Sequence, residues 1–471
     1  MLSENILYLS AGELAKKIEA RAISPVELTE SYLARAEKFG PKLNAFATLT
    51  PDLALEQAHA AEREIKAGRY RGPLHGIPYA AKDLLAVKGY PTTWGVKPFA
   101  KQVFDENAAA IEHLNRAGAV LIGKAAMIEL AGGMGYRFAS ASATGAAKNP
   151  WNTGCWTCGS SSGSGAIVSA ALAAWAIGTE TWGSIVCPAA FCGVTGLRPT
   201  FGRVSRYGTM ALAYSMDKIG PLARTADDCA RVLSVIAAHD ARDPGTLPLD
   251  RAAFSYSAAQ DLHARPLRVG WVVNAWKDKD LQAGVGKVAK EAMRVVRRHA
   301  ASVKDVRLPE GPWDEAGGVI VNVESASAYE NLISSGRTAE LTDPLGQIAG
   351  YVNQQISGSD YLHADRVRAI AQKRMAELFD DYDVLAAPTL PVAATPLEMN
   401  LEKDLSFPDP LGALGNMCGL PAVSVPCGLN EKALPVGLLF VAKAGNDLAA
   451  VQAARTFQQY TNWHKAHPPL H

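Results

Sequence analysis

The amino-acid sequence predicts an α/β fold. Helical segments, glycines and short apolar strands follow one another along the chain, a rhythm that is typical of a sheet covered by helices. The 471 residues are 48% apolar and 20% charged, so the chain is globular and can bury a large core. This length fits one large domain or two or three smaller ones, and we find neither an internal repeat nor a low-complexity tract.

The first seventy residues predict three helices with explicit start signals. Residues 10–13 and 24–27 each place a serine three positions before a glutamate, which is the pattern of a capping box. The second segment also has proline at the first helical position. We expect Gly40 to end the second helix and the third to run from about residue 52 to residue 68.

Residues 71–275 form the predicted core of the fold. A strand through 77–85 is followed by a helix over 107–117 and a strand at 119–122. Residues 132–220 are rich in glycine, serine, threonine and proline, yet apolar runs recur between the turns. A flexible linker would not carry such runs, so we expect ordered turns packed around a site.

The rest of the chain predicts a variable segment and a return to the core. Residues 276–345 are charged and less patterned, which we interpret as a variable or lid region. Residues 346–471 complete the core. The elements expected beyond residue 220 are helices opening at 225 and covering 360–378 and 447–460, and strands at 267–273, 384–387, 423–426 and 436–441.

Composition argues against several classes of protein. With 47 Lys+Arg against 46 Asp+Glu the formal net charge is +1, so we expect neither nucleic acid nor an anionic membrane as a partner. The longest apolar stretch, 166–177, is too short to span a bilayer. The N-terminal residues lack the basic and apolar regions of a signal peptide, and we therefore expect a cytoplasmic protein.

The seven cysteines predict reduced thiols rather than a disulfide framework, because their number is odd and their clustering is not that of a stapled domain. Cys155 and Cys158 resemble half of a zinc or redox motif, but no second pair completes it. We therefore expect neither a metal nor a redox cofactor. Cys187 and Cys192 are most simply small buried residues.

Three residues have the types and settings of a serine–lysine nucleophile system. Ser184 lies in the turn sequence GTETWGSI, Ser160 lies in GSSSGSG, and Lys82 interrupts the apolar segment GIPYAAKDLL. A serine hydroxyl is a weak nucleophile unless a base removes its proton, and a lysine is a base only when neutral. Burial in an apolar strand favours the neutral amine, so Lys82 can act as the base, with Ser160 relaying the proton of Ser184.

About a dozen short motifs, in order and over nearly the whole chain, resemble the amidase signature family. They occupy residues 75–78, 82–83, 149–151, 159–161, 183–185, 192–200, 202–205, 217–221, 387–389, 419–422 and 435–438. The resemblance implies the amidase signature fold over 1–471 as a single domain. That fold is a large twisted mixed β-sheet flanked on both sides by α-helices, and the family needs no cofactor.

The resemblance also implies a Ser–cisSer–Lys triad. Ser184 would be the nucleophile, Lys82 the base and Ser160 the bridging serine, which in the family follows a cis peptide bond. We expect an oxyanion hole in which each backbone N–H contributes roughly 3–4 kcal/mol. Its donors would be the N–H groups of Thr181, Trp182, Gly183 and Ser184.

Contacts to the substrate are expected from Met127, Gly133, Ser161 and Trp182. Met127 follows a predicted strand and could border the site. Ser161 either orients Ser160 or hydrogen-bonds the turn, and both roles remain open. Asp83 would point to the opposite face of the strand from Lys82, which indicates a structural role.

The chain departs from the usual residues of the family on the nucleophile turn. Glu180 stands where the family usually has aspartate, Trp182 where it has glycine and Val186 where it has arginine. Loss of the short acid and the arginine removes an expected ion pair, so Glu180 needs another partner. Trp182 either forms a wall of the acyl pocket or packs into the core.

These observations predict hydrolysis of carbon–nitrogen amide bonds through a serine acyl-enzyme. Aryl or alkyl amides are the expected small-molecule substrates, and carbamates (urethanes) and esters also suit an acyl-enzyme route. Trp182 and its apolar neighbours favour an uncharged group. One alternative is the glutaminase subunit of a tRNA-dependent amidotransferase, which would need a polar pocket and a partner subunit. Another is a non-catalytic binding protein on the same fold. The assembly that we consider for the protein is a homodimer.

Overall fold

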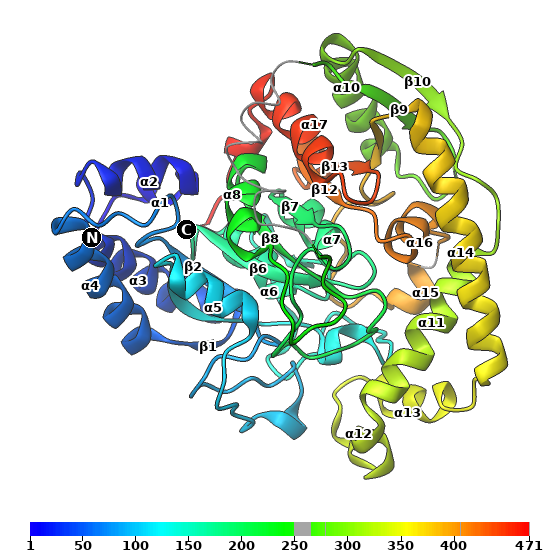
Figure 1. The fold of residues 1–471 in the computed structure, drawn as a ribbon, viewed down its shortest axis with the longest axis horizontal. Helices are drawn as coiled ribbons and strands as arrows, with labels where there is room; N and C mark the ends of the chain where they lie inside the picture. Colours follow the sequence, from blue (N-terminus) through cyan, green and yellow to red (C-terminus); the bar gives the residue numbers. More distant parts are fainter. Residues whose placement is uncertain (249–264, 278, 406, 471) are drawn as a thin grey trace.

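One large mixed β-sheet organises the fold (Figure 1). The computed structural model describes residues 1–248, 265–277, 279–405 and 407–470. Within these ranges the sheet has 11 strands in the order β1-β3-β2-β6-β8-β7-β12-β13-β11-β9-β10, and β4 and β5 form a separate pair. The strands are β1 (Phe46–Leu49), β2 (Pro78–Lys82), β3 (Val120–Ala125), β4 (Lys148–Asn149), β5 (Asn152–Trp156), β6 (Trp175–Glu180), β7 (Thr195–Arg198), β8 (Lys218–Ala223), β9 (Arg268–Val272), β10 (Ser302–Val306), β11 (Val384–Pro388), β12 (Ala422–Leu429) and β13 (Pro435–Ala442).

The sheet combines parallel and antiparallel pairing, which confirms the predicted mixed architecture. β2 lies parallel to β3 and β6, and β9 lies parallel to β10 and β11. The strands from β6 to β11 along the sheet order pair antiparallel. β2, β6, β8 and β13 are buried along their whole length, as expected where helices cover both faces of a sheet.

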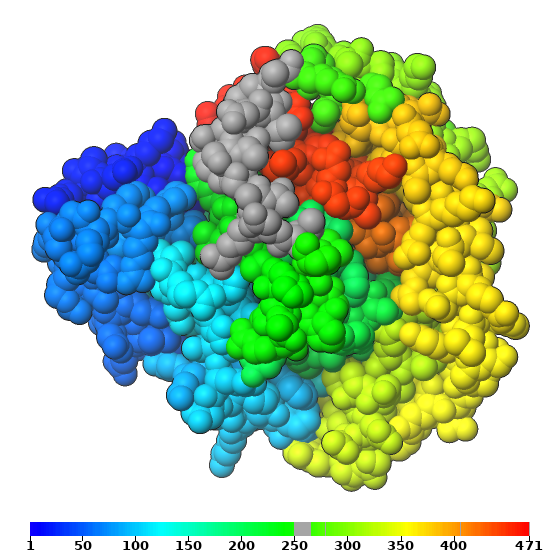
Figure 2. Space-filling model, viewed as in Figure 1, coloured from blue at the N-terminus to red at the C-terminus, as the bar shows by residue number. Residues whose placement is uncertain are grey.

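The helices flank this sheet in several groups. α6 and α7 pack on each other and on central strands, while α8, α10 and α17 form a second contiguous group on β7, β8, β12 and β13. The N-terminal helices form a blue lobe at one edge, and the segment from α11 to α14 lies at the opposite edge (Figures 1 and 2). The helices are α1 (Glu4–Leu7), α2 (Ala11–Glu19), α3 (Pro25–Leu43), α4 (Pro51–Lys66), α5 (Ala109–Arg116), α6 (Ser162–Ser169), α7 (Val186–Cys192), α8 (Ala226–Ile236), α10 (Ala283–His299), α11 (Trp313–Ala328), α12 (Glu330–Ser334), α13 (Pro344–Asn353), α14 (Gly358–Asp381), α15 (Leu401–Asp404), α16 (Pro410–Met417) and α17 (Asp447–Gln459).

The predicted helix starts are confirmed, but one predicted end is wrong. Ser10 and Glu13 form the capping box of α2, and the Ser24 hydroxyl caps α3. At α3, however, that hydroxyl donates to Glu62, and the expected reciprocal bond with Glu27 is not part of the cap. Gly40 does not end α3, which continues to Leu43 and stops at Asn44 in the left-handed region, with φ 49°. Asparagine tolerates that conformation, so the residue after the helix supplies the cap that glycine was expected to supply.

Two segments that lacked a clear pattern prove to be regular. Residues 132–220 contain β4 to β7, α6 and α7, which confirms ordered turns around packed elements. The expected lid segment, 276–345, forms α10, α11 and α12 and adds β10 to the sheet. None of the helices described is both long and apolar enough to cross a bilayer.

Aromatic stacking holds β2 in register with β6. Tyr79 faces Trp175 across the parallel pair, and their rings stack with centroids 4.4 Å apart and planes 5° from parallel. Such a pair contributes about 0.5–1.5 kcal/mol beyond the area that it buries. It also sets the position of Lys82 at the end of β2 relative to the end of β6.

We predict that Gly220→Ala destabilises the protein by about 1–3 kcal/mol. A Cβ atom at this position of β8 would lie 2.1 Å from the Leu197 carbonyl oxygen on β7, so the two strands would have to separate. The matched control is Gly358→Ala at the start of α14, where nothing lies within 4 Å of the added atom. Urea unfolding should show a lower midpoint for Gly220→Ala only. Equal midpoints for the two variants would contradict the prediction.

Candidate active site

Lys82 is the last residue of β2 and is fully buried. Its Nζ donates hydrogen bonds to Ser160 Oγ at 2.7 Å and to Thr179 Oγ1 at 2.9 Å. Burial lowers the pKa of Lys82 to about 7, although the charges of Asp217 and Glu180 act in the opposite direction. A large fraction of the amine is therefore neutral near pH 7, and in that form it can accept a proton.

Ser160 follows a cis peptide bond from Gly159, just before α6, which is the linkage that the family resemblance implies. Its carbonyl oxygen accepts the N–H of Ile128 at 3.1 Å. The neighbouring Ser161 bonds to β6 instead: its Oγ donates to the Thr179 carbonyl at 3.1 Å and accepts the Thr179 N–H at 3.2 Å. Ser161 thus fixes the turn, which is one of the two roles considered for it.

Ser184 lies on the turn between β6 and α7 and is 7% exposed. Its carbonyl oxygen accepts the N–H of Ser161 at 3.3 Å, so the two serine turns are in direct contact. Within the ranges that the structure describes, the Ser184 hydroxyl makes no hydrogen bond, whereas the Ser160 hydroxyl is bonded to Lys82. The structure therefore joins Lys82 to Ser160 and places Ser184 on the neighbouring turn with its hydroxyl unengaged.

The buried side chain of Glu180 holds the nucleophile turn from behind. One carboxylate oxygen accepts the N–H groups of Ile185 at 2.9 Å and Val186 at 3.0 Å. The other oxygen accepts a hydrogen bond from Arg198 Nη1 at 2.7 Å. Burial alone would raise the pKa of Glu180, but the charges of Arg198 and Lys218 hold it below its ordinary value. Arg198, from β7, is therefore the partner that the departure from the family pattern requires.

The backbone N–H groups of residues 181–184 are not hydrogen-bonded to any other group in the described part of the chain. The next two, of residues 185 and 186, are occupied by Glu180. The Thr181 hydroxyl donates to Asp217, whose second oxygen accepts the N–H groups of residues 212 and 213. Side chains therefore hold the backbone of the turn in place while the N–H groups of residues 181–184 stay available, as an oxyanion hole requires.

A cavity of about 450 Å³ opens beside the two serine turns. Gly159 and Gly183, the residues immediately before Ser160 and Ser184, are part of its lining. Aromatic and aliphatic side chains form most of the wall: Tyr136, Trp156, Trp182, Val186, Trp276, Leu345, Leu390, Leu401, Leu405, Phe407, Leu411 and Leu439. Such a lining suits an apolar ligand held by a few polar contacts.

Trp182 is fixed in the wall of this cavity by two neighbouring elements. Its Nε1 donates to Asp409 at 3.0 Å, and its ring packs so closely on α11 that a Cβ at Gly317 would lie 2.6 Å from Cζ3. Burial raises the pKa of Asp409 to about 6, although the bond from Trp182 opposes the shift. Of the two roles considered for Trp182, the wall of the cavity is the one that the structure shows.

The other predicted substrate contacts lie apart from this lining. Met127 and Ser161 are buried and are not part of the lining, and Gly133 faces Leu212 and Tyr329. Their contact with a substrate stays a prediction. Asp83, adjacent to the catalytic candidate Lys82, forms a buried ion pair with Lys124 at 2.9 Å, in keeping with a structural role.

Sequence reasoning missed three residues at the site: Thr179, Arg198 and Asp409. Thr179 and Arg198 lie in the motif-bearing segments, where a polar residue at the inner face of a buried strand is a usable signal. Asp409 has no local signal, because 227 residues separate it from Trp182. Among the described residues, no group of three or more His, Cys, Asp or Glu is placed to hold a metal ion.

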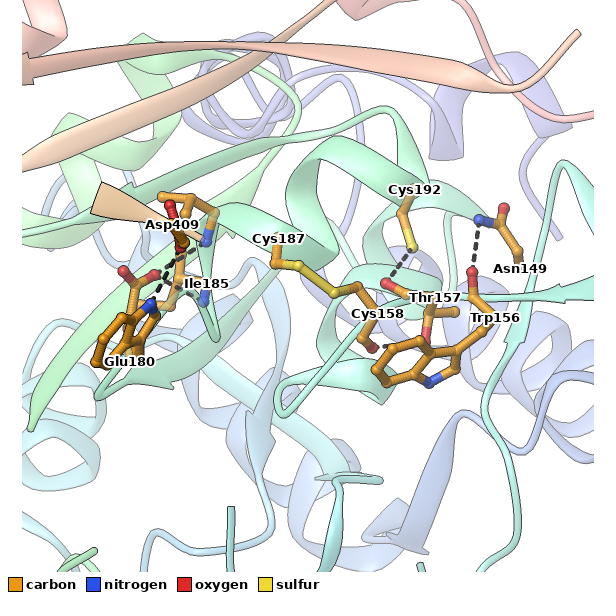
Figure 3. The surroundings of a disulfide bond; sticks show 11 residues. Asn149, Trp156, Thr157, Cys158, Glu180, Ile185, Cys187, Cys192 and Asp409 are labelled. Carbon is orange, nitrogen blue, oxygen red and sulfur yellow. Dashed lines mark hydrogen bonds between the residues drawn. A yellow bond between two sulfur atoms is a disulfide. The ribbon is translucent and has the colours of Figure 1, made fainter. Parts of the chain in front are cut away.

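Figure 3 shows a disulfide bond between Cys158 and Cys187, whose Cα atoms are 5.8 Å apart. This corrects the expectation of reduced thiols only and of Cys187 as a simple buried residue. The packing of α6 on α7 brings the two residues together across a sequence separation of 29, which the spacing of the cysteines does not reveal. The other five cysteines are free and buried.

We predict that Glu180→Ala destabilises the protein by about 3–5 kcal/mol, because it leaves the charge of Arg198 buried without its partner. The control is Glu4→Ala, which removes an ion pair with Arg35 in which the glutamate side chain is 54% exposed. That change should cost no more than about 1 kcal/mol. Thermal and denaturant unfolding measure both, and a wild-type midpoint for Glu180→Ala would refute the role assigned to the pair.

Known proteins with similar sequence and structure match nearly the whole chain. The chain is 35% identical to the A-subunit of the glutamyl-tRNA(Gln) amidotransferase of Methylococcus capsulatus, over 97% of this chain and 98% of that protein. The structure of a peptide amidase from Stenotrophomonas maltophilia is 32% identical, with a TM-score of 0.85 over 98% of both chains. A 6-aminohexanoate cyclic dimer hydrolase is 26% identical, with a TM-score of 0.85 over 98% of this chain and 99% of that chain.

A family model described as Amidase matches residues 27–451, which include Lys82, both serines and the Glu180–Arg198 pair. The match agrees with the cis peptide bond before Ser160 and with the 11-stranded mixed sheet. The chain therefore belongs to the amidase signature family.

Proposed function

We propose that this protein hydrolyses small uncharged amides through an acyl-enzyme formed on Ser184. The observation that carries the proposal is the 2.7 Å hydrogen bond from Lys82 Nζ to Ser160 Oγ, made by a lysine whose pKa burial lowers to about 7. An amine that is neutral near physiological pH, bonded to one serine and one turn away from another, suits general-base activation of a hydroxyl.

In the proposed reaction Ser184 Oγ attacks the amide carbonyl while its proton passes to Ser160, which gives its own proton to Lys82. The N–H groups of residues 181–184 stabilise the charge that develops on the carbonyl oxygen, each by roughly 3–4 kcal/mol. An amide nitrogen leaves poorly as an anion, so the proton held by Lys82 returns through Ser160 to the departing amine. Water then attacks the acyl-Ser184 ester by the same relay.

The lining of the cavity supports an uncharged aromatic or aliphatic acyl group as the ligand. Among the described residues, the charged members of the lining are Arg198, Glu402 and Asp409, and each has a protein partner. Carbamates and esters present the same carbonyl to the nucleophile, so the proposal extends to them as substrate classes.

The second candidate is the glutaminase subunit of an amidotransferase. The name of the curated relative from Methylococcus capsulatus favours it, and a partner subunit would then be expected. Glutamine carries an ammonium and a carboxylate, which need free charged groups in the pocket. The Asp409 carboxylate receives the indole N–H of Trp182, and Arg198 Nη1 is paired with Glu180, which favours the uncharged amide. Arg198 Nη2 is buried without a hydrogen-bond partner in the described part of the chain and is the group that would suit a carboxylate.

One preparation of the chain alone separates these functions. We expect hydrolysis of an aryl anilide to exceed that of glutamine, and we expect mass spectrometry to find a fluorophosphonate adduct on Ser184. Glutaminase activity that requires a partner subunit would support the second candidate instead. The absence of any adduct on Ser184 would indicate a non-catalytic binding protein.

We predict that kcat/KM for an anilide rises with pH through about 7 and then levels off, because the neutral form of Lys82 predominates above its lowered pKa. Lys82→Ala and Ser184→Ala should each lower kcat by about 10²-fold to 10⁴-fold or more. Ser160→Ala should weaken turnover severely while circular dichroism stays that of a folded protein. A near-normal rate in Lys82→Ala would overturn its assignment as the base.

We predict that Gly317→Ala narrows the acyl pocket, because the added Cβ would lie 2.6 Å from the indole of Trp182. The ratio of kcat/KM for a bulky aryl amide to that for acetamide should fall by about tenfold. Gly318→Ala, one residue further along α11, adds an atom with nothing within 4 Å and should leave the ratio unchanged. An unchanged ratio in both variants would contradict the assignment of Trp182 to the pocket wall.

A further inference from the structure

The disulfide between Cys158 and Cys187 connects the two serine turns. Cys158 lies two residues before Ser160, and Cys187 lies three residues after Ser184. Figure 3 shows the bond crossing from the Cys158 turn to the first turn of α7. Both half-cystines also line the 450 Å³ cavity. The bond is thus a covalent link between the turns that carry the proposed relay and nucleophile.

Besides the disulfide, the packing of α6 on α7 and a few hydrogen bonds hold these turns against each other, among them the bond from the Cys192 thiol to the Thr157 carbonyl at 3.7 Å. Their backbones are joined directly by the hydrogen bond from the Ser161 N–H to the Ser184 carbonyl at 3.3 Å. Cys158 itself has φ 63°, a left-handed conformation that costs a residue with a side chain roughly 1–2 kcal/mol. A cross-link that holds Cys158 in place therefore opposes relaxation of the turn before Ser160.

The bond is accessible to small reagents through the cavity. Cys158 is 5% exposed, and Cys187 is half-buried on the same wall. All seven cysteines lie in the described ranges, and the other five are buried thiols. An external thiol exchanges with a disulfide, and access governs the rate of that exchange. Because the other five cysteines are free thiols, the exchange takes place at Cys158–Cys187.

We propose that Cys158–Cys187 is a thiol–disulfide exchange site at which a small dithiol opens the bond and releases the two serine turns from each other, making the oxidised protein the more active form. The inference rests on the proposed function, because it assigns the effect of the bond to the alignment of Ser160 and Ser184.

The exchange proceeds in two balanced steps. A thiolate of the dithiol attacks the sulfur of Cys187, the more exposed partner, forming a mixed disulfide and releasing the Cys158 thiolate, which takes up a proton. The second thiolate of the reagent then attacks the reagent sulfur in the mixed disulfide. This closes a cyclic disulfide and releases the Cys187 thiolate, which is protonated in turn. The protein gains two electrons and two protons, and the dithiol loses them. A disulfide oxidant such as oxidised glutathione reverses the change.

The experiment compares Ser184 reactivity in the two redox states of the full chain. Protein treated with oxidised glutathione should contain five alkylatable thiols when denatured, and protein treated with dithiothreitol should contain seven. A displacement of about 1 Å at a reacting group can cost 10²-fold in rate. Because Glu180 and Ser161 still anchor each turn separately, we expect reduction to slow fluorophosphonate labelling and anilide turnover by about tenfold, reversibly.

Single substitutions distinguish the bond from a general effect of the reductant. Cys187→Ser and Cys158→Ser should be slow in both buffers, whereas the control Cys155→Ser, which removes a nearby free thiol, should keep the tenfold response. If either serine variant fails to fold, the reversible response of the wild-type chain decides. Equal labelling rates in fully oxidised and fully reduced protein would overturn the inference, as would seven thiols after oxidation. Labelling in neither state would instead overturn the proposed function.

Discussion

The buried ion pair between Glu180 and Arg198 is the interaction on which the geometry of the nucleophile turn depends. The Glu180 carboxylate accepts hydrogen bonds from the two backbone N–H groups just after Ser184 and from Arg198 on β7. A single side chain thus fixes the turn to the sheet. It occupies the N–H groups of Ile185 and Val186, whereas those of residues 181–184 have no partner in the described part of the chain. Removal of one partner from such a pair is costly, since a buried charge would remain in the core without its counter-charge.

Burial has a second consequence at this site, because the same desolvation that demands a partner for Glu180 lowers the pKa of Lys82. Among the described residues, Lys82 is hydrogen-bonded to two hydroxyls and to no carboxylate, so the charges of Asp217 and Glu180 offset only part of the loss of water. The amine therefore exists partly in the neutral form that a base requires, at a cost in folding stability that active sites commonly carry. The helices that cover the sheet therefore help to lower the pKa of Lys82, since an exposed lysine would stay protonated at neutral pH.

Much of the fold was predictable because the signals involved are local. The capping box of Ser10 and Glu13, the proline after Ser24 and the apolar strand before Lys82 each act over a few residues, and the structure contains the elements they predict. The prediction that α3 ends at Gly40 was wrong because Asn44, one turn later, forms the C-cap of the helix. The regularity of 276–345 was hidden because its helices bury their faces against distant elements, among them the indole of Trp182 packed on α11.

By itself, the sequence determined the α/β class and the amidase motifs, and it selected Lys82, Ser160 and Ser184 as the proposed chemical centre, because these follow from residue types at short spacing. Only the tertiary structure decided which groups meet them. Arg198 became the partner of Glu180, Asp409 fixed Trp182 from 227 residues away, and Cys158 met Cys187 where α6 packs on α7. Pairings of this kind depend on which strands and helices lie side by side, and that arrangement is set by burial of the whole core rather than by any local pattern.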